Sequence, residues 1–594
     1  MKTRFTTAPL ALLMLVSLGL LDSHPRPVAA TQTPGTPSVM SDTPVLPCDQ
    51  LVTQDFSTVA EASVRIAAAT ENAATDSAPA SCQVTGSVAT NAQFVLELPN
   101  AEWDGRYFQS GCGGYCGNLN PSADCQTAFS RGAALGYSDL GTTGMQDLAW
   151  TADEGARRDF AYAANHELAV AAKAIIAAYY GQPPAFAYFI GCSDGGREAL
   201  MEAQRFPDDF DGIVAGAPAY LLAFLNSYKH TWQYRANTDA NGNPIISADQ
   251  ATLLHAAALA ACDELDGVAD GLIFDPRACA FDPATLLCPA AADATGCLTQ
   301  PQVEAAQRLY SAPVDANGVR YYPAATLPYG SELRWAGGGG PMGGGGNFDQ
   351  MIADVYLGSL SLPLPWQDST WSADTLEFRP RDVFALLPMA SVFDASNPDL
   401  SAFRDHGGKL ILYHGWADDS ISPEGTVAYY DAVQEEMGGP EATQQFARLF
   451  MFPGVYHCSG GYGPSHFEML DPIIDWVERG VPPEQIVATQ YESDLAAAGG
   501  GFENPTQIEA PNSSTPTAGE ATPEATGAQP GGMSEAAPTG AVVRTLPAFP
   551  YPLQPRYTGA GDSNDARNYV PVLPTGPLPD NSAWIGQGLI NSRA

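Results

Sequence analysis

The chain is poor in basic side chains and in long apolar runs. Lysine and arginine total 27 against 66 aspartates and glutamates in 594 residues, which gives a formal net charge of −39. So negative a surface argues against nucleic acid and anionic membranes as partners, although it is also typical of exported proteins with no special function. After the N-terminal segment, no apolar stretch is long enough to span a bilayer. We therefore expect a soluble protein that binds neither nucleic acid nor membrane.

The first 30 residues have the pattern of a secretory signal peptide. Lys2 and Arg4 give a positive start, residues 8–21 form an apolar core, and residues 28–30 (VAA) suit cleavage. The mature protein is therefore expected to be secreted or periplasmic. In that setting the 11 cysteines are expected to form disulfides, with one thiol left over.

The rest of the chain alternates between regular and irregular stretches. Strands predicted at 92–98, 106–109, 185–190, 211–217, 409–414 and 447–452 alternate with helical segments, which predicts an α/β fold with a mostly parallel, doubly wound sheet. Helices are predicted at 60–74, 159–180, 197–206, 423–437 and 472–479. The expected organisation is a tail (31–47), a core (48–223), an inserted lobe (224–397), more core (398–503), a disordered insertion (504–541) and a C-terminal return to the core (542–594).

Residues 185–206 carry the strand, turn and helix pattern of a nucleophile elbow. The apolar strand leads into GCSDGG (191–196), and the helix follows directly. Gly-x-Ser-x-Gly is a weak pattern in a chain with 58 glycines, but this context makes Ser193 the candidate nucleophile of an α/β-hydrolase. The glycine-rich loop 111–117 lies where such folds place the second N–H of the oxyanion hole, and a plain tight turn is the alternative.

A serine hydroxyl needs a general base that is itself oriented by an acid. His457 follows the strand at 447–452 on a loop, and His466 is the second choice. Asp418 follows the strand at 409–414 and is preferred over Asp419, although both could be solvated loop charges. Serine, aspartate and histidine then come in the chain order of α/β-hydrolases.

Cysteines flank the proposed nucleophile and base. Cys192 precedes Ser193 and Cys458 follows His457. A disulfide between them would hold their Cα atoms within about 4.4–6.8 Å and so bring serine and histidine together. Further expected pairs are Cys48–Cys82, Cys262–Cys279 and Cys288–Cys297.

An acidic loop inside the inserted lobe suits a hard cation. Asp263, Asp266 and Asp270 lie within eight residues on a glycine-bent turn, and the carbonyls of Val268 and Leu272 could complete a shell. Oxygen ligands of this number fit Ca²⁺ best, although the spacing is not that of an EF-hand. A merely acidic turn is the alternative.

These motifs together resemble the tannase/feruloyl esterase family of α/β-hydrolases. The resemblance rests on GCSDGG (191–196), HGWAD (414–418), HC (457–458), the loop 263–272 and the YTGAGDSND segment (557–565), which span nearly the whole mature chain. It implies a Ser193–His457–Asp418 triad joined by a Cys192–Cys458 bond. It also implies an oxyanion hole from the backbone N–H groups of Asp194 and Gly114 (Gly113 being the other choice), and a lid that carries structural Ca²⁺ on Asp263, Asp266, Val268, Asp270 and Leu272.

The resemblance further implies a secreted serine esterase that cleaves esters of aromatic acids such as gallate or ferulate through an acyl-enzyme. The alternatives are a mono(hydroxyethyl) terephthalate-type or other aryl esterase and a catalytically dead, calcium-stabilised binding module. Cys112, Cys116 and Cys125 have no clear counterparts in the family, and we expect Cys116–Cys125 with Cys112 free.

Aromatic side chains in the lobe could stack on the substrate ring. The candidates are Tyr321, Tyr322, Tyr329, Trp335 and Trp366. Ile421 is a candidate wall of the acyl pocket. Arg334 could hold a substrate carboxylate, although a surface salt bridge is the preferred interpretation.

Overall fold

The computed structural model describes residues 42–61, 63–289, 296–335, 348–497, 538–574 and 584–586. The predicted signal peptide (1–30), the first part of the predicted tail and residues 504–537 of the predicted disordered insertion lie outside this part of the chain.

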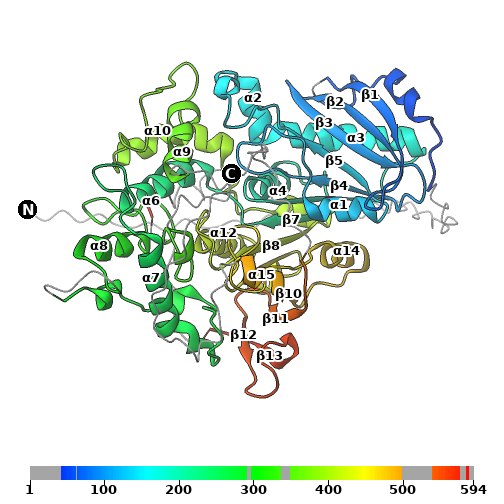
Figure 1. Ribbon diagram of the computed structural model, residues 1–594. Coiled ribbons are helices and arrows are strands. Elements are labelled where there is room, and N and C mark those ends of the chain that lie inside the picture. The colour runs from blue at the N-terminus through cyan, green and yellow to red at the C-terminus, as the bar shows by residue number, and fades with distance from the viewer. Residues whose placement is uncertain are drawn as a thin grey trace, which may run out of the picture. The chain divides into compact units, whose positions relative to one another are not determined.

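A nine-stranded mixed sheet organises the fold, in the order β1-β2-β3-β5-β4-β6-β7-β8-β9 (Figure 1). Strands β5-β4-β6-β7-β8-β9 pair in parallel, and β1, β2, β3 and β5 pair antiparallel. The strands are β1 Arg65–Asn72, β2 Ser81–Val88, β3 Ala92–Pro99, β4 Arg106–Ser110, β5 Ala134–Ser138, β6 Phe186–Cys192, β7 Gly212–Gly216, β8 Lys409–Gly415 and β9 Ala447–Phe452. Small two-stranded sheets pair β10 Ile486–Tyr491 with β11 Val542–Ala548, and β12 Gln554–Tyr557 with β13 Tyr569–Val572.

Helices cover both faces of the sheet, because alternate residues of each central strand are apolar on both sides. Phe189 and Ile213 pack into one hydrophobic cluster with α3 and α4, whereas Ile190 and Val214 pack into another with α1 and α14. The helices are α1 Ala123–Ser130, α2 Glu154–Arg158, α3 Ala164–Tyr180, α4 Asp194–Arg205, α5 Leu222–Phe224, α6 His230–Ala236, α7 Ala248–Cys262, α8 Gln300–Leu309, α9 Phe348–Val355, α10 Pro380–Phe393, α11 Ser401–His406, α12 Pro423–Glu436, α13 Pro440–Thr443, α14 Leu470–Arg479 and α15 Glu492–Ala497. The α/β-hydrolase fold predicted from the motifs is confirmed.

The helix predicted at 60–74 is wrong, because this stretch contains strand β1. Alanines favour a helix there, but the backbone pairs with β2 from Arg65 to Asn72 at the edge of the sheet, where the side chains are exposed or half-buried. Pairing with a neighbouring strand outweighs a helix preference of a few tenths of a kcal/mol per residue.

The regular elements of the described residues between β7 and β8 are helices, and Figure 1 shows α6 to α10 gathered beside the sheet. Helices α7 and α8 have a hydrophobic cluster of their own, whereas α9 and α10 contribute to the main core. Where a separate lid would begin and end stays a prediction. Among the residues that the structure describes, no helix combines the length and apolar character that crossing a bilayer requires.

Candidate active site

Ser193 stands at the sharp turn between β6 and α4. Its φ is +66°, a backbone conformation that costs a non-glycine residue free energy. The turn is tight enough that a Cβ at Gly191 would lie 2.3 Å from the Gly195 carbonyl oxygen, and one at Gly196 would lie 2.2 Å from that of Gly216. Glycine is therefore required on both sides of the serine, as in a nucleophile elbow.

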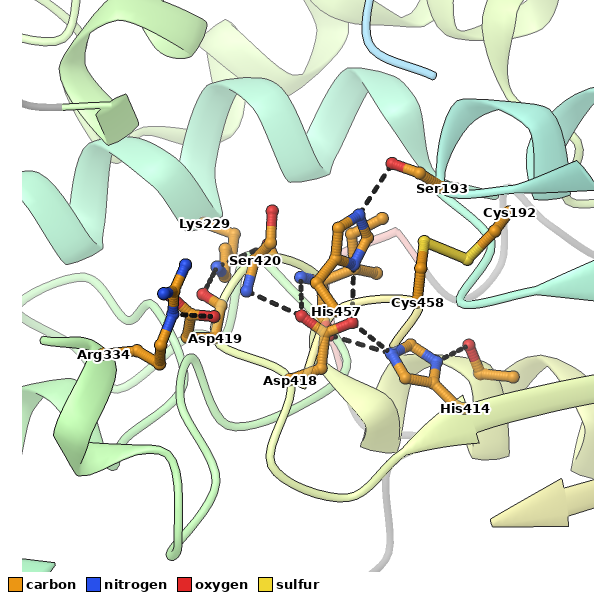
Figure 2. A network of polar contacts seen from close by, with 12 residues as sticks. Cys192, Ser193, Lys229, Arg334, His414, Asp418, Asp419, Ser420, His457 and Cys458 are labelled. Atoms are coloured by element: carbon orange, nitrogen blue, oxygen red, sulfur yellow. Dashed lines mark hydrogen bonds and ion pairs between the residues drawn. A yellow bond between two sulfur atoms is a disulfide. The ribbon is translucent and has the colours of Figure 1, made fainter. Parts of the chain in front are cut away.

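His457 connects Ser193 to Asp418 (Figure 2). Ser193 Oγ lies 2.8 Å from His457 Nε2, and His457 Nδ1 lies 2.7 Å from Asp418 Oδ2. The serine follows β6, the aspartate follows β8 and the histidine follows β9, so all three come from the carboxyl edge of the sheet. The structure therefore brings together the three side chains that the sequence suggested.

Asp418 is fully buried and is surrounded by donors. Its Oδ1 accepts the N–H groups of Ser420 (2.7 Å) and Ile421 (2.9 Å), and His414 Nε2 lies 2.9 Å from its Oδ2. Burial raises the pKa of this carboxyl, but the His457 and His414 contacts outweigh burial and hold the pKa well below its usual value. Asp418 is thus an ionised carboxylate in contact with His457 Nδ1.

The pKa of His457 is shifted in the opposite direction. Burial lowers it, but the Asp418 charge and hydrogen bond raise it above 6.5 overall. The buried imidazole therefore holds a proton more tightly than a free one, which favours the imidazolium that forms when His457 takes the serine proton.

The Cys192–Cys458 disulfide is present, with its Cα atoms 6.0 Å apart. Figure 2 shows it beside Ser193 and His457. The bonds Cys48–Cys82, Cys262–Cys279 and Cys288–Cys297 are also present.

The predicted Cys116–Cys125 bond is wrong: Cys112 pairs with Cys116, and Cys125 is the free, buried thiol. Cys112 and Cys116 pack with the hydrophobic cluster on one face of the sheet, whereas Cys125 on α1 packs with the cluster on the other face. The sheet therefore separates the two thiols that the sequence suggested as a pair.

The loop that should complete the oxyanion hole is attached to α4. Glu198 Oε2 accepts the N–H of Cys112 (3.3 Å) and the amide of Asn165 (2.8 Å). A Cβ at Gly195 would lie 3.1 Å from Cys112 N, so the loop packs directly on the first turn of the helix. The N–H of Asp194 lies in that turn, where helix N–H groups have no intrahelical partner. The roles of Asp194 and Gly114 stay predictions.

Other histidines contact acidic side chains that are not part of the triad. His466, the second choice of base, lies 2.9 Å from Asp494, while His230 and His255 lie near Asp349 and Glu332.

Three side chains on α3, α4 and the loop after α4 could hold a metal ion. Ligand atoms of His166, Glu202 and Asp209 lie within 4.8 Å of one another. Lys173 lies beside them, with Nζ 3.9 Å from Asp209 Oδ1. Its ammonium already offsets one carboxylate charge of this group.

The acidic loop of the lobe folds around Asp263, whose Oδ1 accepts the N–H groups of Asp270, Gly271 and Leu272. Asp266 Oδ2 and Asp270 Oδ2 are buried and have no hydrogen-bond partner. Burial raises the pKa of Asp266 to about 7 and that of Asp270 to about 6, with Arg544 opposing the second shift. These two oxygens are the atoms that a cation would bind.

The suggested specificity residues lie in different surroundings. Tyr321 and Tyr322 are fully buried in the main core, Trp335 packs against Tyr310, and Trp366 is 70% exposed. Tyr329 packs against Tyr310, with ring centroids 4.2 Å apart. Ile421 is buried, and its backbone N–H donates to Asp418 Oδ1. Which of them touch substrate stays a prediction.

Two charged contacts beside the triad, Asp419 with Arg334 and Lys229 with the acid loop, were not predicted from the sequence. Asp419 is buried 3.7 Å from Arg334 Nε, and burial raises the pKa of Asp419 to about 7. Lys229 is fully buried and contacts the backbone that follows Asp418. No local motif marks either arrangement, because their partners are more than 80 residues away in the chain.

The chain matches known proteins over most of its length. The family model "Tannase and feruloyl esterase" matches residues 77–572. The chain is 32% identical over 599 residues to a mono(2-hydroxyethyl) terephthalate hydrolase of Piscinibacter sakaiensis, covering 88% of this chain and 90% of the relative. It is 29% identical over 436 residues to feruloyl esterase B of Aspergillus niger, covering 70% and 80%. The crystal structure of feruloyl esterase B from Aspergillus oryzae superimposes with a TM-score of 0.69 at 26% identity, covering 88% and 99%.

Proposed function

Because this chain belongs to the tannase and feruloyl esterase family, we propose that it is a serine esterase that cleaves carboxylic esters of aromatic acids. The observation that supports this most directly is the line of contacts from Ser193 Oγ through His457 to Asp418. Acyl transfer by serine needs such a line, because the hydroxyl must lose its proton as it attacks.

In the proposed mechanism, His457 Nε2 takes the proton of Ser193 as Oγ attacks the ester carbonyl. The negative oxygen forms against the N–H groups of Asp194 and Gly114. His457 then protonates the leaving alcohol, and water, activated by the same imidazole, hydrolyses the aromatic acyl-enzyme. Asp418 fixes the tautomer of His457 and stabilises its charged form.

We propose that the acidic loop binds a structural Ca²⁺ ion. The buried oxygens of Asp266 and Asp270 that have no hydrogen-bond partner fit a hard cation, and Asp263 with the carbonyls of Val268 and Leu272 would supply further oxygen ligands. Arg544 lies 3.8 Å from Asp270 and offsets only part of the negative charge. The ion would hold this loop in place and would take no part in the chemistry.

We also propose that the protein is exported. The five disulfides of the described residues are typical of oxidising compartments, in agreement with the signal peptide expected from the sequence.

One observation favours a narrower second candidate, an aromatic ester with a free carboxylate. The Arg334 side chain is 35% exposed and lies beside Asp419 next to the triad, where it could pair with an anionic group. The relative from Piscinibacter sakaiensis is named for such an ester.

The proposed function is tested with a fluorophosphonate probe and a panel of esters. Labelling should occur on Ser193, and kcat/KM should be higher for methyl ferulate or methyl gallate than for short aliphatic esters. A higher kcat/KM for mono(2-hydroxyethyl) terephthalate than for the neutral phenolic esters would favour the second candidate. An unlabelled, inactive protein would indicate a binding module on a hydrolase fold.

A further inference from the structure

Lys229 ends a π-helical segment (Leu225–Lys229) just before α6, and its side chain is fully buried. A buried ammonium loses its hydration, and burial lowers the pKa of this lysine. Such a group persists only where the surrounding structure supplies oxygens for it. The location of those oxygens therefore indicates what Lys229 does.

All three N–H donors of Lys229 have acceptors. Nζ donates to the carbonyls of Asp419 (3.0 Å) and Ser420 (2.7 Å) and to Oε1 of Gln233 (2.6 Å). Figure 2 shows the ammonium beside these carbonyls, on the segment that directly follows Asp418. The backbone that places the proposed catalytic acid is thus attached through Lys229 to a helix about 190 residues earlier in the chain.

The same segment holds Asp418 from its other side. The N–H groups of Ser420 and Ile421 donate to Asp418 Oδ1, while Lys229 binds the carbonyls of Asp419 and Ser420. The peptide between Asp419 and Ser420 is therefore fixed at both ends, by its own N–H to Asp418 and by its C=O to Lys229. Loss of the lysine would free this peptide to rotate and would loosen both donors on Asp418.

We propose that Lys229 is a positioning residue for the proposed reaction: its ammonium fixes the loop 418–421 and so fixes Asp418 against His457. This inference rests on the proposed function. Lys229 also adds a positive charge near His457, which lowers the pKa of the imidazole and partly offsets the effect of Asp418. The other titratable and charged groups around this site are Asp418, Asp419, His414, His230, Asp349 and Arg334.

The experiment measures kcat and KM on methyl ferulate across pH for the wild type, Lys229→Met, Lys229→Arg and Lys409→Met. Lys229→Met should lower kcat by about 10- to 100-fold with little change in KM, because a loosened acid misplaces the base. The acid limb of its pH–kcat profile should move to higher pH, since His457 without the nearby cation holds its proton more tightly. Lys229→Arg keeps the charge and should keep the limb in place. Lys409, whose Nζ donates to the Gly407 carbonyl at the other end of β8, is the matched control and should change neither quantity.

Unchanged kcat and an unmoved acid limb in a folded Lys229→Met variant would overturn the proposal. So would an equal loss in Lys229→Met and Lys229→Arg with no movement of the limb, because packing alone would then explain it. If circular dichroism shows that Lys229→Met does not fold, Lys229→Gln replaces it as the uncharged partner of Lys229→Arg in the same comparison. An inactive wild type would instead contradict the proposed function.

Discussion

Cys192 and Cys458 are joined by a disulfide across a sequence separation of 266, and each is the direct neighbour in the sequence of a member of the triad. The covalent bond therefore fixes the distance between Ser193 and His457 in addition to the packing of the sheet. This relationship gives the first prediction.

Replacing both Cys192 and Cys458 with alanine should lower kcat/KM by about 10- to 100-fold, because the serine and the imidazole then lose their fixed separation. Opening so long a loop should also lower the free energy of unfolding by up to about 5 kcal/mol. Ester hydrolysis and chemical denaturation measure the two effects. The matched control is the Cys288→Ala/Cys297→Ala variant, which removes a disulfide with a sequence separation of 9 that adjoins no triad residue in the sequence, and it should leave kcat/KM unchanged. An equally active Cys192 and Cys458 variant would show that packing alone aligns the triad.

The activity should rise with pH through the pKa of His457, since only the neutral imidazole can accept the serine proton. Asp418 raises this pKa, so Asp418→Asn should shift the acid limb of kcat/KM to lower pH. The same change should cost about 10⁴-fold in kcat, because the orienting carboxylate is lost. A pH–rate series on both proteins checks the direction. Asp419→Asn is the comparison variant, and a larger effect there would make Asp419 the orienting acid.

Chelation of Ca²⁺ should lower the melting temperature of the wild type by a few degrees. An ion at one hundred times its dissociation constant stabilises the native state by about 2.7 kcal/mol. Asp266→Asn should begin at the lower melting temperature and respond little to a chelator. Asp315→Asn, which changes an exposed acidic turn, is the control and should respond like the wild type. A wild type whose melting is indifferent to chelator and to added Ca²⁺ would make the loop an acidic turn only.

Gly196→Ala should destabilise the protein by about 1–3 kcal/mol and reduce activity, because overpacking would push the elbow away from β7. The added Cβ would meet the Gly216 carbonyl at 2.2 Å, a backbone atom that cannot turn aside. Gly358→Ala is the control, since its nearest neighbour would lie at an ordinary 3.5 Å. Thermal unfolding and hydrolysis of methyl ferulate compare the two variants. Equal behaviour would show that the elbow tolerates a side chain here.

Local patterns were sufficient for the parts of the site that lie within one strand and the turn after it. Ser193 was recognisable because an apolar strand, two flanking glycines and a helix are adjacent in the sequence. Asp418 and His457 were recognisable for a similar reason, since each follows a short buried strand. The buried strands themselves were predictable, because both of their faces must be apolar.

Contacts between residues that are distant in the chain were harder to predict from the sequence. The pairing of Cys112 with Cys116 depends on which face of the sheet each thiol occupies, and the alanine-rich stretch of β1 depends on a free edge at β2. The contact of Lys229 with the carbonyls after Asp418 joins two segments with no shared motif.

The sequence by itself determined the fold class, the three candidate catalytic residues and the cysteines that flank two of them. Tertiary structure alone decided which remaining thiol stays free, that residues 65–72 extend the sheet, and that a buried lysine supports the acid loop. The physical reason is the distance along the chain over which each kind of signal acts. Apolar periodicity, glycine turns and flanking cysteines act within a few residues, whereas burial and the choice of partner follow from how distant segments pack.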